Sequence, residues 1–325
     1  MKKIAFMLGL GLIMVVQAVR AETSLGGGSV VRFATVVQAK EILTRPDDFV
    51  RSMSPFDRSA RLKTDRAVLE KEYLEFVGKN ILEWDAEEQQ KVSVALQEVQ
   101  AKLAVWALPF PPEVLLVKTT GAEEGRAAYT RANVIILPAN EIAAPAAKLG
   151  KTICHELFHV LSRANPKLKE KLYAVIGFVS CDEVLFPAFL RARKITNPDA
   201  PANNHCLRVK IAGADQWVIP ILYAGAEKYD VARGGEFFDY LKFEFLVVTK
   251  KDQAPVVEPV YDGRQPRLVE PARLSGFFEQ VGRNTGYIIH PEEILADNFA
   301  LLILEGTTVP SPDILKKMTA VLTGK

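Results

Sequence analysis

The chain has 325 residues, of which 49% are hydrophobic and 25% are charged, and its formal net charge is +2 at pH 7. This composition is typical of a globular protein that is long enough to bury a large core. The near-balance of charges lacks the basic excess that marks nucleic-acid-binding proteins, so no nucleic-acid partner is expected.

The first 21 residues have the three-part order of a secretory signal peptide. Lys2 and Lys3 precede an apolar run from Ile4 to Val16, and small residues follow at Ala18 and Ala21. The apolar run is shorter than the roughly 20 residues that a membrane-spanning helix needs. We predict cleavage after Ala21, with Ala18 as the alternative, and a bacterial protein that is periplasmic or secreted, without stable membrane insertion afterwards.

The segment that follows the signal peptide shows two patterns. Residues 22–34 contain three consecutive glycines and are expected to form a flexible leader. Residues 35–107 have helical periodicity and are expected to form a helical N-terminal subdomain that carries no chemistry. Within it, one helix is expected to begin after Thr64 or Asp65, and a longer one after Asp85, where a glutamate three residues later completes a capping box.

Residues 108–325 are expected to form the domain that carries the function. Strands are predicted where branched apolar residues gather, at 113–118, at 129–137 and in three stretches between 206 and 249. A helix is predicted between Pro145 and Asn165, and two or three more near the C-terminus. Together the patterns predict an α+β fold, with a mixed sheet beside the 145–165 helix and helical parts at both ends.

The three cysteines, Cys154, Cys181 and Cys206, are too few for a disulfide scaffold. In an oxidising compartment one pair can form. Cys181 with Cys206 is favoured because Cys154 lies inside the predicted helix, but the sequence leaves the pairing open.

The strongest chemical signal is the run His155-Glu156-Leu157-Phe158-His159 within that helix. Two imidazoles four residues apart project from one helix face, at a separation that suits a single tetrahedral metal ion. A carboxylate between them can reach a metal-bound water as a general base without ligating the ion. The rest of 153–161 is apolar or cysteine, so these polar side chains would be buried without partners unless an ion joins them.

This HELFH run resembles the signature of the zincin metallopeptidases. The resemblance implies a Zn²⁺ ion bound by His155 and His159, catalysis by Glu156, and a peptide or protein substrate that pairs with the strand preceding the motif helix. It also implies a zincin-like catalytic domain over residues 108–325. The sequence after His159 lacks the glycine and the third histidine of the metzincins, which excludes that subtype.

A catalytic zinc site usually has a third protein ligand, and Glu293 is the best candidate. Glu293 and Asp297 lie one turn apart, and from Ile294 to Leu304 only Asp297 and Asn298 are polar. A carboxylate in so apolar a helix needs a cationic or hydrogen-bonding partner. The stretch EILADN resembles the second motif of gluzincins in its neprilysin-like form, which implies that Glu293 is the ligand and Asp297 orients a zinc-bound imidazole. The spacer from His159 is longer than in those enzymes.

Glu183 is the alternative third ligand, because its distance from His159 along the chain is close to that of short-spacer gluzincins. Pro187 stands where the orienting acid would be, which weakens this alternative. Further alternatives are Asp182, Asp215 and His205.

Tyr287 and His290 precede the Glu293 helix and are candidates for donors to the oxyanion of a hydrolysis reaction. The ordinary alternative is that both are loop residues, with His290 capping the helix.

These residues predict a zinc-dependent hydrolase, in first place a metallopeptidase that acts outside the cytoplasm with Glu156 as general base. Two alternatives stay open. One is a zincin-like protein that binds metal or envelope peptides without turnover, although a structural site has no need of Glu156. The other is an amidase that acts on cell-wall crosslinks.

Overall fold

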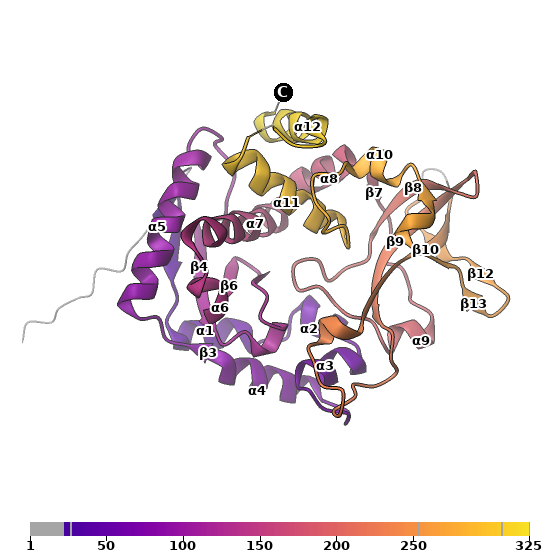
Figure 1. Ribbon diagram of the computed structural model, residues 1–325, viewed down its shortest axis with the longest axis horizontal. Coiled ribbons are helices and arrows are strands. Elements are labelled where there is room, and N and C mark those ends of the chain that lie inside the picture. Colours follow the sequence, from indigo (N-terminus) through magenta and orange to yellow (C-terminus); the bar gives the residue numbers. More distant parts are fainter. Residues whose placement is uncertain (1–22, 27, 252–253, 307, 325) are drawn as a thin grey trace, which may run out of the picture.

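The computed structural model describes residues 23–26, 28–251, 254–306 and 308–324, and the fold is α+β (Figure 1). The predicted signal peptide lies outside the described residues. Within the described part of the chain, no helix has both the length and the apolar character needed to cross a bilayer.

The first sheet has six strands in the order β1-β2-β4-β6-β5, with β3 against β4. β2, β4 and β6 are parallel, and β5 pairs antiparallel with β6 at the edge of the sheet. The predicted strand at 129–137 is therefore a hairpin, with Ala132 at φ +51 in the turn. The bounds of the six strands are Thr23–Gly26 (β1), Ser29–Phe33 (β2), Ile81–Leu82 (β3), Glu113–Thr119 (β4), Tyr129–Arg131 (β5) and Val134–Pro138 (β6).

The prediction of a flexible leader over residues 22–34 is wrong for the residues that form β1 and β2. Gly26 pairs with Ser29 and Gly28 has φ +86, so these two glycines belong to a hairpin instead of a linker. The apolar residues that follow them then pair with β4, where Val31 lies opposite Val114.

The helices of residues 35–107 lie along the lower and left sides of the view in Figure 1. The capping box predicted at Asp85 is confirmed, because its side chain accepts from the backbone N–H of Glu88 and the Glu88 carboxylate accepts in return. The start predicted at Thr64 or Asp65 is wrong, since the helix begins at Glu70. The backbone N–H of Leu69, directly before it, donates to the Glu72 carboxylate. The bounds are Val36–Leu43 (α1), Asp48–Ser52 (α2), Pro55–Arg61 (α3), Glu70–Asn80 (α4) and Ala86–Leu103 (α5).

The centre of the molecule is the helix α7 (Ala146–Ala164), which confirms the helix predicted between Pro145 and Asn165. It packs against α5, β5, β6 and the C-terminal helix α11 (Pro291–Leu304). The remaining helices are α6 (Ala139–Ala143), α8 (Pro166–Val175), α9 (Ala188–Arg191), α10 (Phe277–Val281) and α12 (Pro312–Thr323).

The second sheet, on the right in Figure 1, has seven strands in the order β11-β10-β9-β8-β15, with β7 on β8 and β14 on β10. The three strands predicted between 206 and 249 are confirmed as β8, β9 and β10. The bounds are Phe178–Ser180 (β7), His205–Ile211 (β8), Ala214–Ala224 (β9), Leu241–Lys250 (β10), Val257–Pro259 (β11), Leu268–Val269 (β14) and Leu274–Ser275 (β15), with the separate hairpin Tyr261–Asp262 (β12) and Gln265–Pro266 (β13).

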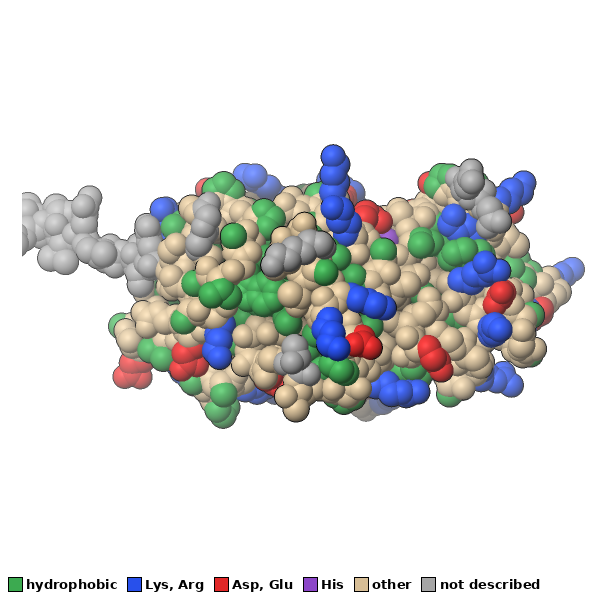
Figure 2. All heavy atoms as spheres, turned by 90° about the horizontal axis from the view of Figure 1, so that it is seen from above, with side chains coloured by type: hydrophobic (Ala, Val, Ile, Leu, Met, Phe, Trp, Pro, Cys, Tyr) green, Lys and Arg blue, Asp and Glu red, His purple; other side chains and the backbone are tan. Residues whose placement is uncertain are grey.

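The largest hydrophobic core joins both ends of the chain around α7. It includes Leu96 of α5 and Phe158 of α7 together with Phe299 of α11 and Met318 of α12. The expected boundary near residue 107 therefore does not separate two cores, because α5 buries its apolar face on the motif helix. On the face drawn in Figure 2, acidic and basic side chains are interspersed, which agrees with the near-zero net charge.

Candidate metal centre

The helix α7 presents the motif residues from a buried position. Its apolar face is the core described above, and the opposite face carries His155, Glu156 and His159. Glu156 and His159 are only 4% and 1% exposed. Burying two such polar side chains costs several kcal/mol unless partners compensate for it, so the contacts around them decide what the site can do.

The helix α11 lies against α7 and supplies the carboxylates. It begins at Pro291, and His290 caps it by accepting a hydrogen bond from the backbone N–H of Glu292 at 3.1 Å. Because the rest of the helix is apolar apart from Asn298, it is buried almost completely. Its first two turns place Glu292, Glu293 and Asp297 opposite the two histidines.

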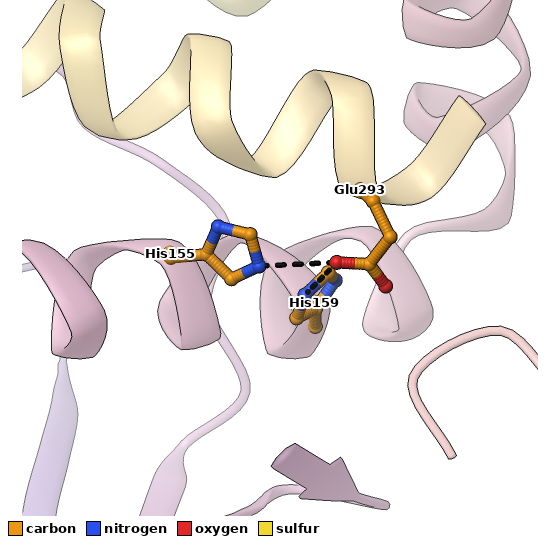
Figure 3. Close-up of side chains that lie close together, drawn as sticks. All are labelled: His155, His159 and Glu293. Atoms are coloured by element: carbon orange, nitrogen blue, oxygen red, sulfur yellow. Dashed lines mark hydrogen bonds and ion pairs between the residues drawn. The ribbon is translucent and has the colours of Figure 1, made fainter. Parts of the chain in front are cut away.

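The side chains of His155, His159 and Glu293 point toward one another (Figure 3). The Nε2 atoms of His155 and His159 lie 3.1 and 3.6 Å from the same oxygen, Oε2 of Glu293. One ligand atom from each residue lies within 4.8 Å of the other two. The fold thus joins the motif of α7 to Glu293, which lies 134 positions after His159 in the chain.

The other nitrogen of each imidazole is bound to a carboxylate. His155 Nδ1 lies 2.9 Å from Asp297 Oδ1, and His159 Nδ1 lies 3.2 Å from Glu292 Oε1. A metal-binding histidine typically donates its outer N–H to a carboxylate in this way, which fixes the ring and leaves Nε2 free to ligate. The expected partnership of Asp297 with a motif histidine is therefore present, with His155.

Glu292 is a site residue that the sequence analysis missed. Its second oxygen accepts from Ser162 of α7 at 3.0 Å and from the hydroxyl of Tyr173 of α8 at 2.5 Å. An acid in the first turn of a helix is ordinary, because the macrodipole favours it there. Only contacts with residues more than 100 positions away distinguish Glu292, so no local signal marked it.

Two buried polar atoms at the centre have no hydrogen-bond partner among the described residues, namely His159 Nε2 and Glu156 Oε2. Native proteins rarely leave such atoms unpaired. Two imidazole nitrogens and a carboxylate oxygen are the donor set of many catalytic zinc sites. The orphaned nitrogen faces the shared Glu293 oxygen, so the residues present fit a transition-metal ion.

The electrostatics of the cluster also favour a cation. Burial by itself lowers the pKa of His155, but the hydrogen bonds with Asp297 and Glu293 outweigh burial and raise it to about 10. Burial opposes the charged form of Glu293 as well, yet the two histidines hold its pKa well below the usual range. Without an ion the cluster retains protons, which a metal would replace.

Glu156 does not bind the other motif residues. Burial, and next the negative charge of Asp199, raise the pKa of the Glu156 carboxyl to about 8. It lines a cavity of about 380 Å³ whose wall also includes His155, Glu293, Asp297 and Tyr287. A carboxyl group beside a cavity and a ligand set can exchange a proton with a molecule bound there.

The segment after α9 contributes two residues that the sequence analysis also missed. Asn197 donates from Nδ2 to Glu293 Oε1 at 2.6 Å and holds the second oxygen of that carboxylate. A carboxylate oxygen of Asp199 lies within 4.8 Å of ligand atoms of Glu156 and His159. Both residues lie in an irregular stretch with two prolines, where no periodic pattern reveals the direction of a side chain.

The structure places the two candidate oxyanion donors differently. Tyr287 lines the cavity, its ring centroid is 6.4 Å from that of His155, and it is 42% exposed. His290 instead caps α11 and does not line this cavity. Its side chain is buried, and burial lowers the pKa to about 3. The alternative of a capping role describes His290 correctly, because the first turn of α11 needs an acceptor.

The other candidates for a third ligand lie elsewhere. Glu183 accepts from the backbone N–H of Asn203, Asp215 pairs with Arg208 on the surface, and His205 binds Glu170 and Asn204. The backbone N–H of Asp182 donates to Pro255. None of these four belongs to either group of possible metal ligands found among the described residues.

None of the three cysteines belongs to either group of possible metal ligands among the described residues. They are buried and unbridged in the described structure. Cys154 packs in the main core, whereas Cys181 and Cys206 share a second core.

Comparison of the chain with protein-family models, with curated proteins and with solved structures found no match.

Proposed function

We propose that the protein is a zinc-dependent hydrolase, a metallopeptidase of zincin-like architecture. The observation that carries the proposal is the arrangement of the two imidazoles, each held by a carboxylate at Nδ1 while Nε2 faces Glu293. A structural ion pair alone would not require a second carboxylate behind each ring.

The arrangement around the site supports the zincin-like part of the proposal. The motif helix α7 lies against the sheet, and the antiparallel edge strand β5 contacts it. An edge strand beside a catalytic centre offers backbone N–H and C=O groups to an extended peptide. The cavity next to Glu156 continues along residues 127 and 128, directly before β5.

In the proposed reaction, His155, His159 and Glu293 would hold the ion, and Glu156 would move the proton. A bound zinc ion supplies Lewis-acid polarisation of the scissile carbonyl and lowers the pKa of water. The unpartnered oxygen of Glu156 takes a proton from the attacking water and delivers it to the leaving amine. Tyr287 lies on the cavity wall, where its hydroxyl can donate to the oxyanion.

The proposal includes export, with action on peptides or proteins in the periplasm or outside the cell. It rests on the N-terminal pattern described above. Binding without turnover is the competing proposal, and the unpartnered Glu156 beside a cavity argues against it.

The test compares Glu156→Gln with wild type. We expect wild type to cleave peptides in a mixed library followed by mass spectrometry, and the variant to bind the same amount of zinc while losing at least 100-fold in rate. Glu305→Gln, which changes a half-exposed carboxylate at the end of α11, is the matched control. Undiminished cleavage by Glu156→Gln would refute the catalytic assignment.

A further inference from the structure

The edge strand β5 is open to a substrate at one end only. The backbone N–H of Thr130 donates to Asp199 Oδ1 at 2.7 Å, and the Thr130 hydroxyl donates to the same oxygen. Arg163 of α7 donates to the carbonyl of Ala132 at 2.9 Å and to that of Asp199 at 3.1 Å. From Thr130 onward, the outer edge of β5 is therefore occupied by the chain's own groups.

The segment that closes this end is fixed in place. Asn197 accepts from the backbone N–H of Asp199 at 2.9 Å and donates to Glu293 at 2.6 Å. Two prolines, Pro198 and Pro201, restrict the backbone on both sides of Asp199. The segment is thus bound to the ligand set through Asn197 and to β5 through Asp199.

The open end of the strand lies upstream. Ala127 and Ala128 directly precede β5 and line the cavity that also contains His155, Glu156 and Asp199. A peptide that extends the sheet can therefore pair with this upstream stretch, but it cannot continue past Thr130.

Of the two charged side chains at the closed end, Asp199 lines the cavity and Arg163 does not, so Asp199 determines which terminus of a peptide fits there. A peptide that pairs antiparallel with β5 directs its N-terminus toward Asp199, and a parallel one directs its C-terminus there. A carboxylate attracts an ammonium group and repels another carboxylate. Antiparallel pairing with the free N-terminus at Asp199 is thus the favourable orientation.

The spacing limits how much substrate fits between the ligand set and Asp199. A carboxylate oxygen of Asp199 is within 4.8 Å of a ring nitrogen of His159. Each residue of an extended peptide spans about 3.3–3.6 Å. When the scissile carbonyl lies at the ligand set, the space between it and Asp199 accommodates the amino group of the residue that carries this carbonyl. It does not accommodate a further residue before it.

From these contacts we infer that the site is an aminopeptidase site, which removes one residue at a time from peptides with a free N-terminus bound by Asp199. The inference rests on the proposed hydrolase function. In each turnover one water is consumed and the first peptide bond breaks. The products are a free amino acid and a peptide that is shorter by one residue.

The experiment uses the full mature protein with zinc and two peptides of identical sequence, one with a free N-terminus and one N-acetylated. Products are followed by mass spectrometry. We expect a ladder of single-residue losses from the peptide with the free N-terminus. We expect kcat/KM to be lower for the acetylated peptide by a factor on the order of 100 or more, because acetylation removes one partner of a buried charge pair. This comparison needs no variant to fold.

A second arm measures Asp199→Asn, with the exposed Asp215→Asn as its control. We expect Asp199→Asn to raise KM for the peptide with the free N-terminus. The ratio of kcat/KM between the free and the acetylated peptide should fall, with zinc content unchanged. Loss of zinc from this variant would make Asp199 a ligand and overturn the inference. Equal cleavage of both peptides at internal bonds would overturn the inference alone, whereas cleavage of neither would overturn the proposed function with it.

Discussion

The contact between Asp297 and His155 allows the metal proposal to be tested away from the ligands themselves. Asp297 Oδ1 lies 2.9 Å from His155 Nδ1, and its other oxygen accepts from the hydroxyl of Thr285. In Asp297→Asn, the amide oxygen can still accept from Nδ1–H while the amide nitrogen faces Thr285. The ring orientation is then preserved, and the change removes only the negative charge.

The expected size of the effect follows from this geometry. Losing the carboxylate behind a metal-binding histidine typically weakens metal affinity by about 10- to 100-fold, which corresponds to about 1.4–2.8 kcal/mol. Asp297→Asn should lie at the lower end of this range because the hydrogen bond survives. Asp297→Ala should lie at the upper end, since it removes both the charge and the acceptor that fixes the ring.

The assay is competition for zinc against a chromophoric chelator at one fixed pH, with thermal unfolding recorded beside it. Asp313→Asn is the matched control, because Asp313 is an exposed residue of the neighbouring helix α12, paired with Lys316. Equal zinc affinity in wild type and both Asp297 variants would refute the idea that His155 is oriented for a metal ion.

Three further predictions concern the rest of the molecule. Burial raises the pKa of Glu123 to about 7, so the stability that its protonated form contributes is fully present below pH 4.5 and is lost as the pH rises through 7. Glu123→Gln should abolish this loss, which is on the order of 3 kcal/mol when urea unfolding is compared at pH 4.5 and 8. A variant whose unfolding free energy depends on pH as in wild type would contradict this prediction. Phe299 packs on Phe158 between α11 and α7, and Phe299→Ala should cost about 3–5 kcal/mol in the same assay, whereas a cost below about 1 kcal/mol would contradict the described core. Cys181 and Cys206 should form a disulfide in protein isolated from an oxidising compartment, leaving one free thiol per chain by thiol titration; three free thiols would contradict this pairing.

The sequence predicted the α+β class and the motif helix because both depend on local patterns. The run around His155 has helical spacing and an apolar background, and α7 extends from Ala146 to Ala164. Glu293 could be proposed because a carboxylate at that position in an apolar helix needs a partner. Its position beside both histidines then required the packing of α11 on α7, which no local pattern encodes.

The features that the sequence did not reveal depend on distant contacts. The three glycines near residue 27 are typical of a linker, and only the pairing of β2 with β4, about 80 residues later in the chain, makes a hairpin of this segment. Glu292 has the ordinary role of an acid at a helix start until Tyr173 and Ser162 are placed beside it. Asp199 lies in an irregular segment, where side-chain direction follows from tertiary contacts alone.

The metal centre is tested most simply by the metal stoichiometry and coordination of the purified chain, measured by elemental analysis together with X-ray absorption at the zinc edge. We expect one zinc per chain, bound by two nitrogen donors and one carboxylate from the protein, and we expect its loss in His155→Ala, His159→Ala and Glu293→Ala. A folded wild-type chain that contains no transition metal and takes up none when zinc is supplied would contradict it.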